Sequence, residues 1–419
     1  MFLFLLVSRS GGLISILNTI NYLDKGRIES IVVRIRINCY LEFTDMVKKL
    51  ALVCVWFFLH PAIAYAASME EMEKRIEALE ADVEIYREES QEEADSHRTP
   101  VRISGYVDAE YSVDSRDSVD NGFRLHHLSL FFKKQLAEKW RFFSEIEYED
   151  APKFEGEGKA QTPPAEGEVI DTAQGKIFVE AVNIDYLWNP KANFRIGRFF
   201  TPAGIWSIDH YPPFVPTQIR PEHIRKIFPQ VVDGVAAFGT FALGSSFLNY
   251  DLYVGNGEGN TGKKDQNSSK AVGTRAYFLF PILDHFRVGA SAYTDTLNNG
   301  DDKTSVGMDM KIRAGIFTFQ AEAADAEFKP VSTPTYNRTG YYGQFLFRPT
   351  DHWSFGYRYD FYDANDSTVS ELTTNSLFIN YHINTDIKLK AEFHDRQDKD
   401  PSKEDYNLSI LSIVYYLGD

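Results

Sequence analysis

Ser207, Asp209 and His210 are the residue types of a hydrolase triad, and they lie close together in the chain. In such enzymes the serine attacks, the histidine accepts its proton and the aspartate orients the imidazole. A serine nucleophile is commonly held on a turn with glycine two positions before and two positions after it. At those two positions around Ser207 this chain has Ile205 and Asp209. We therefore expect no catalytic residues.

Histidines and carboxylates also raise the question of metal binding. His126 and His127 are adjacent in a segment with strand alternation, and a regular strand directs neighbours to opposite faces. They are therefore predicted not to share a metal ion. Asp301, Asp302 and the glycine-rich segment 254–262 could bind calcium, but ordinary extracellular loops explain them better. No helix follows the glycine-rich segment, as a phosphate cradle would need. We expect neither a metal nor a cofactor.

A third group is basic and lies in the proline-rich segment 204–230. Its charged residues include Arg220, His223, Arg225 and Lys226, in a chain whose net charge is −16. Prolines restrict the backbone, so a long loop that contains them can hold a fixed shape. What this loop does depends on the elements that carry it.

The amino-acid composition limits the kind of fold that these elements can build. The 419 residues include 23 Tyr and 32 Phe, apolar residues are scattered singly, and no run typical of a soluble core recurs. The strongly acidic balance excludes nucleic acid as an expected partner.

Export is predicted by residues 46–66, a secretory signal peptide. Lys48 and Lys49 precede an apolar run, and Ala64-Tyr65-Ala66 forms the cleavage site. The run is too short for a membrane anchor, and Val53 before Cys54 does not fit a lipoprotein signal. Residues 1–45 are then a mis-called extension before the true start at Met46. Both cysteines fall outside the mature chain, which predicts no disulfides.

Residues 67–99 are expected to form an acidic coiled coil and a linker. Apolar residues recur at alternating spacings of three and four, as in a heptad seam: Met69, Met72, Ile76, Leu79, Val83 and Tyr86. A solvated helix lying alone is the alternative, but so short a helix is marginal in water without a partner.

From residue 100 to 419 the apolar pattern has period two, which predicts about sixteen strands. The expected starts are Val101, Gly122, Trp140, Gly175, Ala192, Val231, Ser246, Lys270, His285, Lys303, Ile316, Thr339, His352, Glu371, Asp386 and Glu404. A soluble β-sandwich would also alternate, but here short turns alternate with long polar loops along the chain. That pattern is typical of an antiparallel transmembrane β-barrel, with aromatic residues such as Trp188 and Trp353 near strand ends. An exported chain that forms a closed transmembrane barrel is expected in the outer membrane of a Gram-negative cell, where the outer face of the barrel contacts lipid.

Strand order makes 204–230 the third and longest extracellular loop, and we expect it to fold inward and narrow the lumen. The segment FRIGRFFTPAG before it resembles the phosphate-selective porin family, which reads roughly R-x-G-Q-F-x-x-P-x-G at this point. The match falls on Arg195, Gly197, Phe199, Pro202 and Gly204, while Arg198 replaces the family's Gln and the chain ends in YYLGD rather than an aromatic residue. The resemblance covers the barrel and implies a homotrimeric diffusion porin for small hydrophilic solutes, with anions such as phosphate as candidates.

The expected constriction comprises Arg220, Arg225, Lys226, His223 and Arg198. For the loop residues the alternative is that they are solvated on an exposed loop. For Arg198 the alternative is that its side chain extends to the rim of the barrel. Charges on strand faces must avoid lipid, so the expected lumen charges are Glu145, Glu147, Glu149, Lys388 and Lys390. Three hypotheses follow: a water-filled channel, a plugged structural barrel linking envelope layers, and a hydrolase on the barrel rim. We favour the channel and do not expect an enzyme.

Overall fold

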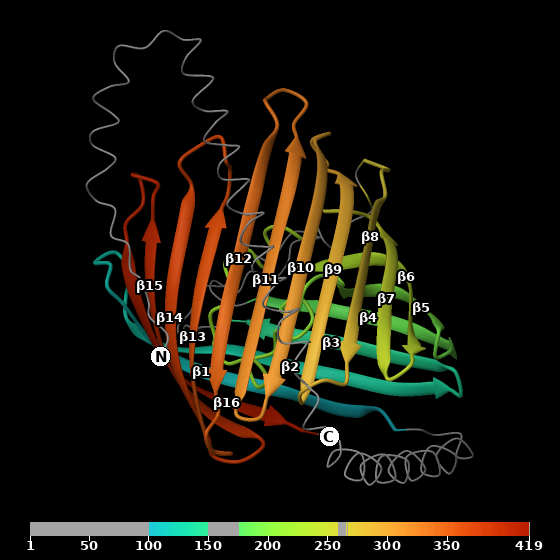
Figure 1. Ribbon diagram of the computed structural model, residues 1–419, viewed down its shortest axis with the longest axis horizontal. Helices are drawn as coiled ribbons and strands as arrows, with labels where there is room; N and C mark the ends of the chain where they lie inside the picture. The colour runs from blue at the N-terminus through green and yellow to red at the C-terminus, as the bar shows by residue number, and fades with distance from the viewer. Residues whose placement is uncertain (1–99, 150–175, 259–264, 266, 419) are drawn as a thin grey trace, which may run out of the picture. The chain divides into compact units, whose positions relative to one another are not determined.

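The computed structural model describes residues 100–149, 176–258, 265 and 267–418, which form a closed barrel of sixteen strands (Figure 1). The strands are β1 (Arg102–Asp114), β2 (Gly122–Ala137), β3 (Trp140–Glu149), β4 (Lys176–Asn189), β5 (Ala192–Phe200), β6 (Val231–Leu243), β7 (Ser246–Gly255), β8 (Ala271–Phe280), β9 (His285–Thr296), β10 (Asp302–Ala314), β11 (Phe317–Lys329), β12 (Tyr336–Phe347), β13 (Trp353–Asp363), β14 (Glu371–His382), β15 (Ile387–Asp398) and β16 (Tyr406–Leu417). Within these described ranges, no helix has the length and apolar character to cross a membrane.

Every strand pairs antiparallel with its neighbours in sequence, and the ends of the sheet meet between β1 and β16. At that seam Tyr106 faces Tyr416 and Asp108 faces Val414 in register. Closure leaves no strand edge, so backbone polar groups of the wall bond within the sheet. The prediction of an all-β, closed antiparallel barrel of about sixteen strands is confirmed.

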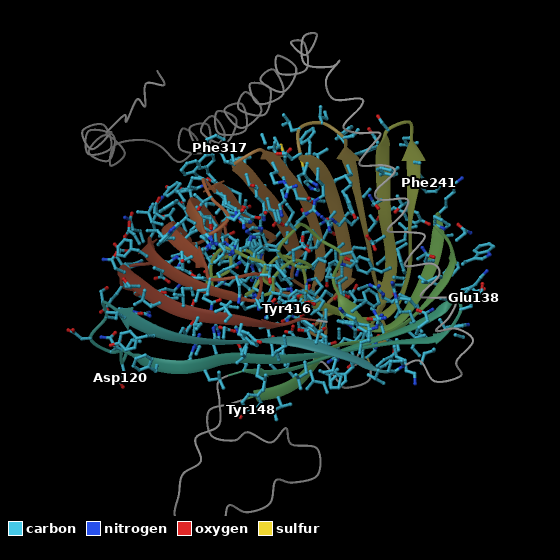
Figure 2. The ribbon with its side chains drawn as sticks, turned by 90° about the horizontal axis from the view of Figure 1, so that it is seen from below. Asp120, Glu138, Tyr148, Phe241, Phe317 and Tyr416 are labelled. Carbon is cyan, nitrogen blue, oxygen red and sulfur yellow. The ribbon has the colours of Figure 1, made fainter. Side chains whose placement is uncertain are left out.

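The two faces of the wall differ in polarity, as the period-two pattern requires. On β14, Leu377 and Ile379 are exposed on the outside, whereas Ser376 and Asn380 are buried. The same alternation recurs around the barrel, so polar and charged side chains fill the interior. Figure 2 shows these side chains on the wall, with Asp120 and Glu138 at opposite ends of the barrel.

Aromatic side chains collect on the outer face near the short turns. Trp353 packs on Tyr381 with ring centroids 4.7 Å apart, and Trp188 stacks on Phe194 at 6.3 Å. Trp140 packs on Tyr186 at 4.8 Å beside the β2–β3 turn. This arrangement fits the amphipathic belt that barrels place at the edge of the membrane.

The prediction that His126 and His127 point to opposite faces is wrong. The pairing of β1 with β2 shifts at this point, because Asp108 pairs with His127 while Ala109 pairs with Leu125. His126 is therefore the extra residue of a β-bulge, and a bulge reorients its side chain. The two imidazoles stack on the same side of the wall, with ring centroids 3.7 Å apart.

Several predictions lie outside the described residues. These are the extension 1–45, the signal peptide 46–66, the coiled coil and linker 67–99, and the predicted loop 155–174 between β3 and β4.

Candidate functional site in the barrel interior

The connection between β5 and β6, residues 201–230, runs inside the barrel. At its start, the backbone amides of Ile205 and Trp206 donate to the Glu322 carboxylate on β11, at 2.8 and 3.0 Å. The Gly204 amide contacts Ser291 Oγ on β9 at 3.3 Å. Glu322 points inward and is buried, so these bonds fix the beginning of the loop against the inner wall.

The middle of the loop contacts a different part of the wall. Arg358 on β13 donates to Thr217 Oγ1 at 2.6 Å and to the Ile219 carbonyl at 2.9 Å. The Gln218 amide donates to Glu392 on β15 at 2.7 Å. Backbone groups of this part of the loop therefore form hydrogen bonds with side chains of the wall, in place of the backbone partners that a helix or sheet would supply.

The end of the loop returns to the strands near its start. Ser305 on β10 donates to the Ile227 carbonyl at 2.9 Å, and Ile227 and Phe228 are buried beside Phe199 in an apolar cluster. Arg225 Nη2 lies 3.4 Å from Glu180 Oε1 on β4. Since its contacts reach β4 on one side of the barrel and β11 and β13 on the other, the loop spans the lumen.

Gly204 has a steric reason to be glycine. Its φ is +62°, and a Cβ atom there would stand 1.9 Å from Glu322 Oε2. Any side chain would displace the carboxylate that holds the loop. The other motif residues also form this junction: Arg195 binds Asp185 through two hydrogen bonds of 2.7 and 2.9 Å, and Phe199 and Pro202 are buried.

The four cationic candidates of the loop have different surroundings. Lys226 is bonded to Glu222 and lies 4.7 Å from the centre of the Tyr362 ring, while Arg225 faces Glu180. His223 is buried against Tyr342, and burial together with the nearby Arg358 lowers its pKa to about 3, so this imidazole is neutral.

Arg220 faces the acidic side of the interior. Its positive charge acts on Glu147 and on His127. Glu145, Glu147 and Glu180 are buried here, with carboxylate oxygens within 4.8 Å of one another. Glu149 lies on the same face of β3 and is half-buried. Three carboxylates this close repel one another, so a facing cation stabilises their charged forms.

The opposite, short-turn side of the loop borders a cavity of about 620 Å³. The wall contributes Lys311, Arg313 and Arg348 as well as Asp284 and Asp351, and the loop contributes Asp209 and Trp206. Sequence reasoning missed these three cations. The alternation on β10 carried a signal, because Lys311 and Arg313 are two residues apart and share the inward face with Asp309.

Lys388 and Lys390 both point into the interior. Lys388 Nζ donates to the Pro213 carbonyl at 2.5 Å, and Lys390 Nζ contacts Gln218 Oε1 at 3.4 Å. Both side chains therefore contact the inward loop. His210, considered above as a triad member, lies with Nε2 3.4 Å from Glu180 Oε2.

Arg198 lies on the outer side of the wall. It binds Asp233 on β6 through hydrogen bonds of 2.7 and 2.8 Å and also donates to the Val179 carbonyl. Asp233 alternates with Val232 and Ala236, which are buried on the inner side, and shares its face with exposed Val235. Arg198 therefore does not line the lumen, and its prediction as a constriction residue is wrong.

Arg198→Ala should therefore leave ion preference unchanged. Its charge is neutralised by Asp233 and separated from the lumen by the wall, which predicts a reversal potential within error of the parent in a planar bilayer. The pair is half-buried, so heat-modifiable gel migration should confirm that the variant retains the barrel. A clear shift toward cations would place Arg198 on the ion path instead.

Comparison with known proteins identifies the fold. No family model matches the chain. An uncharacterized protein of Aquifex aeolicus (strain VF5) is 29% identical over 219 residues, which is 48% of this chain and 46% of that protein, so the match spans about half of the relative's length. Among solved structures, an anion-selective porin from Comamonas acidovorans matches with a TM-score of 0.56 and 12% identity, over 76% of this chain and 99% of that one.

Two further structures agree. Salmonella typhi OmpF, in complex with daunomycin, matches with a TM-score of 0.52 and 14% identity, over 75% of this chain and 97% of that one. A loop L8 deletion mutant of OmpT, an outer-membrane protein of Vibrio cholerae, matches with a TM-score of 0.52 and 12% identity, over 76% and 99%. At these identities the similarity concerns the fold, which is that of outer-membrane porins.

Proposed function

We propose that the protein is an outer-membrane channel for the passive diffusion of small hydrophilic solutes, narrowed by the inward loop 204–230. The observation that carries the proposal is a sixteen-strand barrel with an apolar outer face and a charged interior. A barrel of this size is wide enough to leave an aqueous lumen. The loop contacts both sides of that lumen, which suits a constriction that selects by size and charge.

The interior charges support a weak preference for anions. Glu145, Glu147 and Glu180 line one side, but Arg220 and Arg225 of the loop face them. On the other side, Lys311, Arg313 and Arg348 border the cavity beneath the loop together with Asp209, Asp284 and Asp351, so the charges there balance and the loop cations carry the preference. The narrowest part of a pore dominates selectivity, and there the loop presents its cations. Phosphate is a candidate solute by resemblance, and the anion-selective name of the Comamonas protein is in keeping with this sign.

Uptake of uncharged sugars tests the channel directly. Liposomes that contain the mature protein should swell in isotonic solutions of small sugars, and swelling should slow steeply with sugar size because the loop narrows the lumen. Empty liposomes serve as the control. A structural barrel with a sealed lumen would give no swelling above this control at any sugar size, and that outcome would overturn the proposal.

From the resemblance we also propose a homotrimer in the outer membrane. Chemical cross-linking of the protein in intact outer membranes should then give a ladder that ends at three copies. A ladder that stops at one or two copies would contradict this assembly without affecting the channel proposal.

A further inference from the structure

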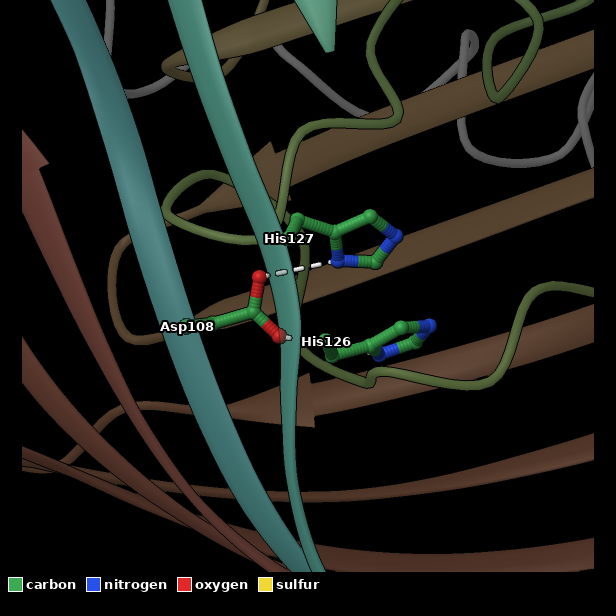
Figure 3. A group of neighbouring side chains, drawn as sticks. All are labelled: Asp108, His126 and His127. Atoms are coloured by element: carbon green, nitrogen blue, oxygen red, sulfur yellow. Dashed lines mark hydrogen bonds and ion pairs between the residues drawn. The ribbon is translucent and has the colours of Figure 1, made fainter. Parts of the chain in front are cut away.

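We propose that Asp108, Glu110, His126 and His127 form a binding site for a transition-metal ion such as Zn²⁺ on the inner wall of the barrel. The bulge in β2 brings the two imidazoles together beside Asp108 of the adjacent strand β1 (Figure 3). Glu110, also on β1, reaches His126. Two imidazoles and two carboxylates are donor types that Zn²⁺ accepts.

The donor atoms converge on a small volume. His127 Nδ1 lies 2.8 Å from Asp108 Oδ1, and His126 Nδ1 lies 3.6 Å from Asp108 Oδ2 and 3.2 Å from Glu110 Oε2. One ligand atom each of Asp108, His126 and His127 lies within 4.8 Å of the others. Donors at about 2.0–2.2 Å from a tetrahedral zinc ion are separated by comparable distances.

A second observation points to a missing ligand. Glu110 Oε2 and His126 Nδ1 are buried and make no hydrogen bond of good geometry, although they lie 3.2 Å apart as a potential ion pair. The Glu110 side chain is only 3% exposed, and its free oxygen faces His126. Buried polar atoms that lack hydrogen bonds destabilise the folded protein. A bound cation between them would satisfy both atoms at once.

The remaining contacts orient the ligands as outer partners of metal sites do. Arg124 Nε donates to Glu110 Oε1 at 3.0 Å, which leaves Oε2 available. Gln218 Nε2, on the inward loop, donates to Asp108 Oδ2 at 2.9 Å. Such bonds fix the direction in which a carboxylate presents its free lone pairs. The Gln218 contact also connects the site to the loop.

Calorimetric titration of the mature protein with ZnCl₂ in detergent tests the site. We expect one saturable site, and a much weaker response to MgCl₂ because imidazole ligands favour zinc over magnesium. Loss of an outer partner alone weakens metal sites about 10–100-fold, so His126→Gln and Glu110→Gln should each weaken zinc binding by at least about tenfold. Glu110→Gln keeps the shape of the side chain, which protects the test against misfolding.

His352→Gln is the matched control, since His352 lies in the turn before β13, away from the bulge. Its zinc affinity should equal the parent's, and heat-modifiable migration on gels should show that all variants retain the barrel. Absence of saturable zinc binding, or equal affinity in the parent and in both site variants, would overturn the proposal. Because calorimetry does not require conduction, this result stands apart from that of the swelling test.

Discussion

Replacing residues 208–222 with a short Gly-Ser linker should raise the single-channel conductance on the order of threefold, because this segment crosses an otherwise wide lumen. The design keeps Ile205 and Trp206 bonded to Glu322, and it keeps Ile227 and Phe228 in their apolar cluster. The wall itself is unchanged, so the barrel should fold. Single-channel recording in planar bilayers compares the two proteins.

Shortening the loop 364–370 between β13 and β14 is the control for loop removal as such. In that loop Asp366 contacts Asn337 at the start of β12, and Ser370 contacts Asp363 of its own hairpin. It lies at the end of the barrel, so its removal should leave conductance unchanged. Equal conductance of the parent and the 208–222 variant would show that ions do not pass the inward loop.

Neutralising the loop cations should shift selectivity toward cations. In the triple variant Arg220→Ala, Arg225→Ala and Lys226→Ala, the carboxylates of Glu147 and Glu180 lose the charges that face them. Charged clefts change local ion concentration by roughly tenfold or more. We therefore expect a several-fold rise in the cation-to-anion permeability ratio, measured as the reversal potential under a KCl gradient.

The same measurement has two internal checks. The double variant Lys399→Ala, Lys403→Ala removes two exposed charges from the loop between β15 and β16, where they pair with Glu371 and Asp398. It should leave the reversal potential unchanged. At 1 M salt the Debye length is about 3 Å, so the effect of the triple variant should shrink. A triple variant with the parent's reversal potential at both salt concentrations would remove the loop from the ion path.

The sequence determines the barrel clearly because a membrane wall has one side in lipid and one side in water. That requirement imposes the period-two pattern on every strand, so the predicted starts at Gly122, Trp140, Ala192, Val231 and Ser246 coincide with the observed ones. The same rule predicts that the glutamates of β3 face the interior, since a charge that faces lipid is costly.

The interior was harder to predict because local irregularities decide it. A regular strand separates His126 from His127, and only the bulge brings them together. Arg198 is a different case, because it shares the outer face of β5 with exposed Phe194 and Ile196 and alternates with buried Phe199, as a regular strand requires. The wall residues that hold the loop, such as Glu322 and Arg358, are distant in sequence from the groups they bind. The apolar periodicity of the strands does not show which residues bind each other across the lumen.

Single-channel recording of the mature protein in a planar bilayer tests the central claim most directly. A water-filled barrel narrowed by its own loop should insert in discrete steps of uniform conductance, with each step stable over time. If purified, heat-modifiable barrels insert into the bilayer and produce no steps under any applied voltage, the lumen is closed and the channel account is contradicted.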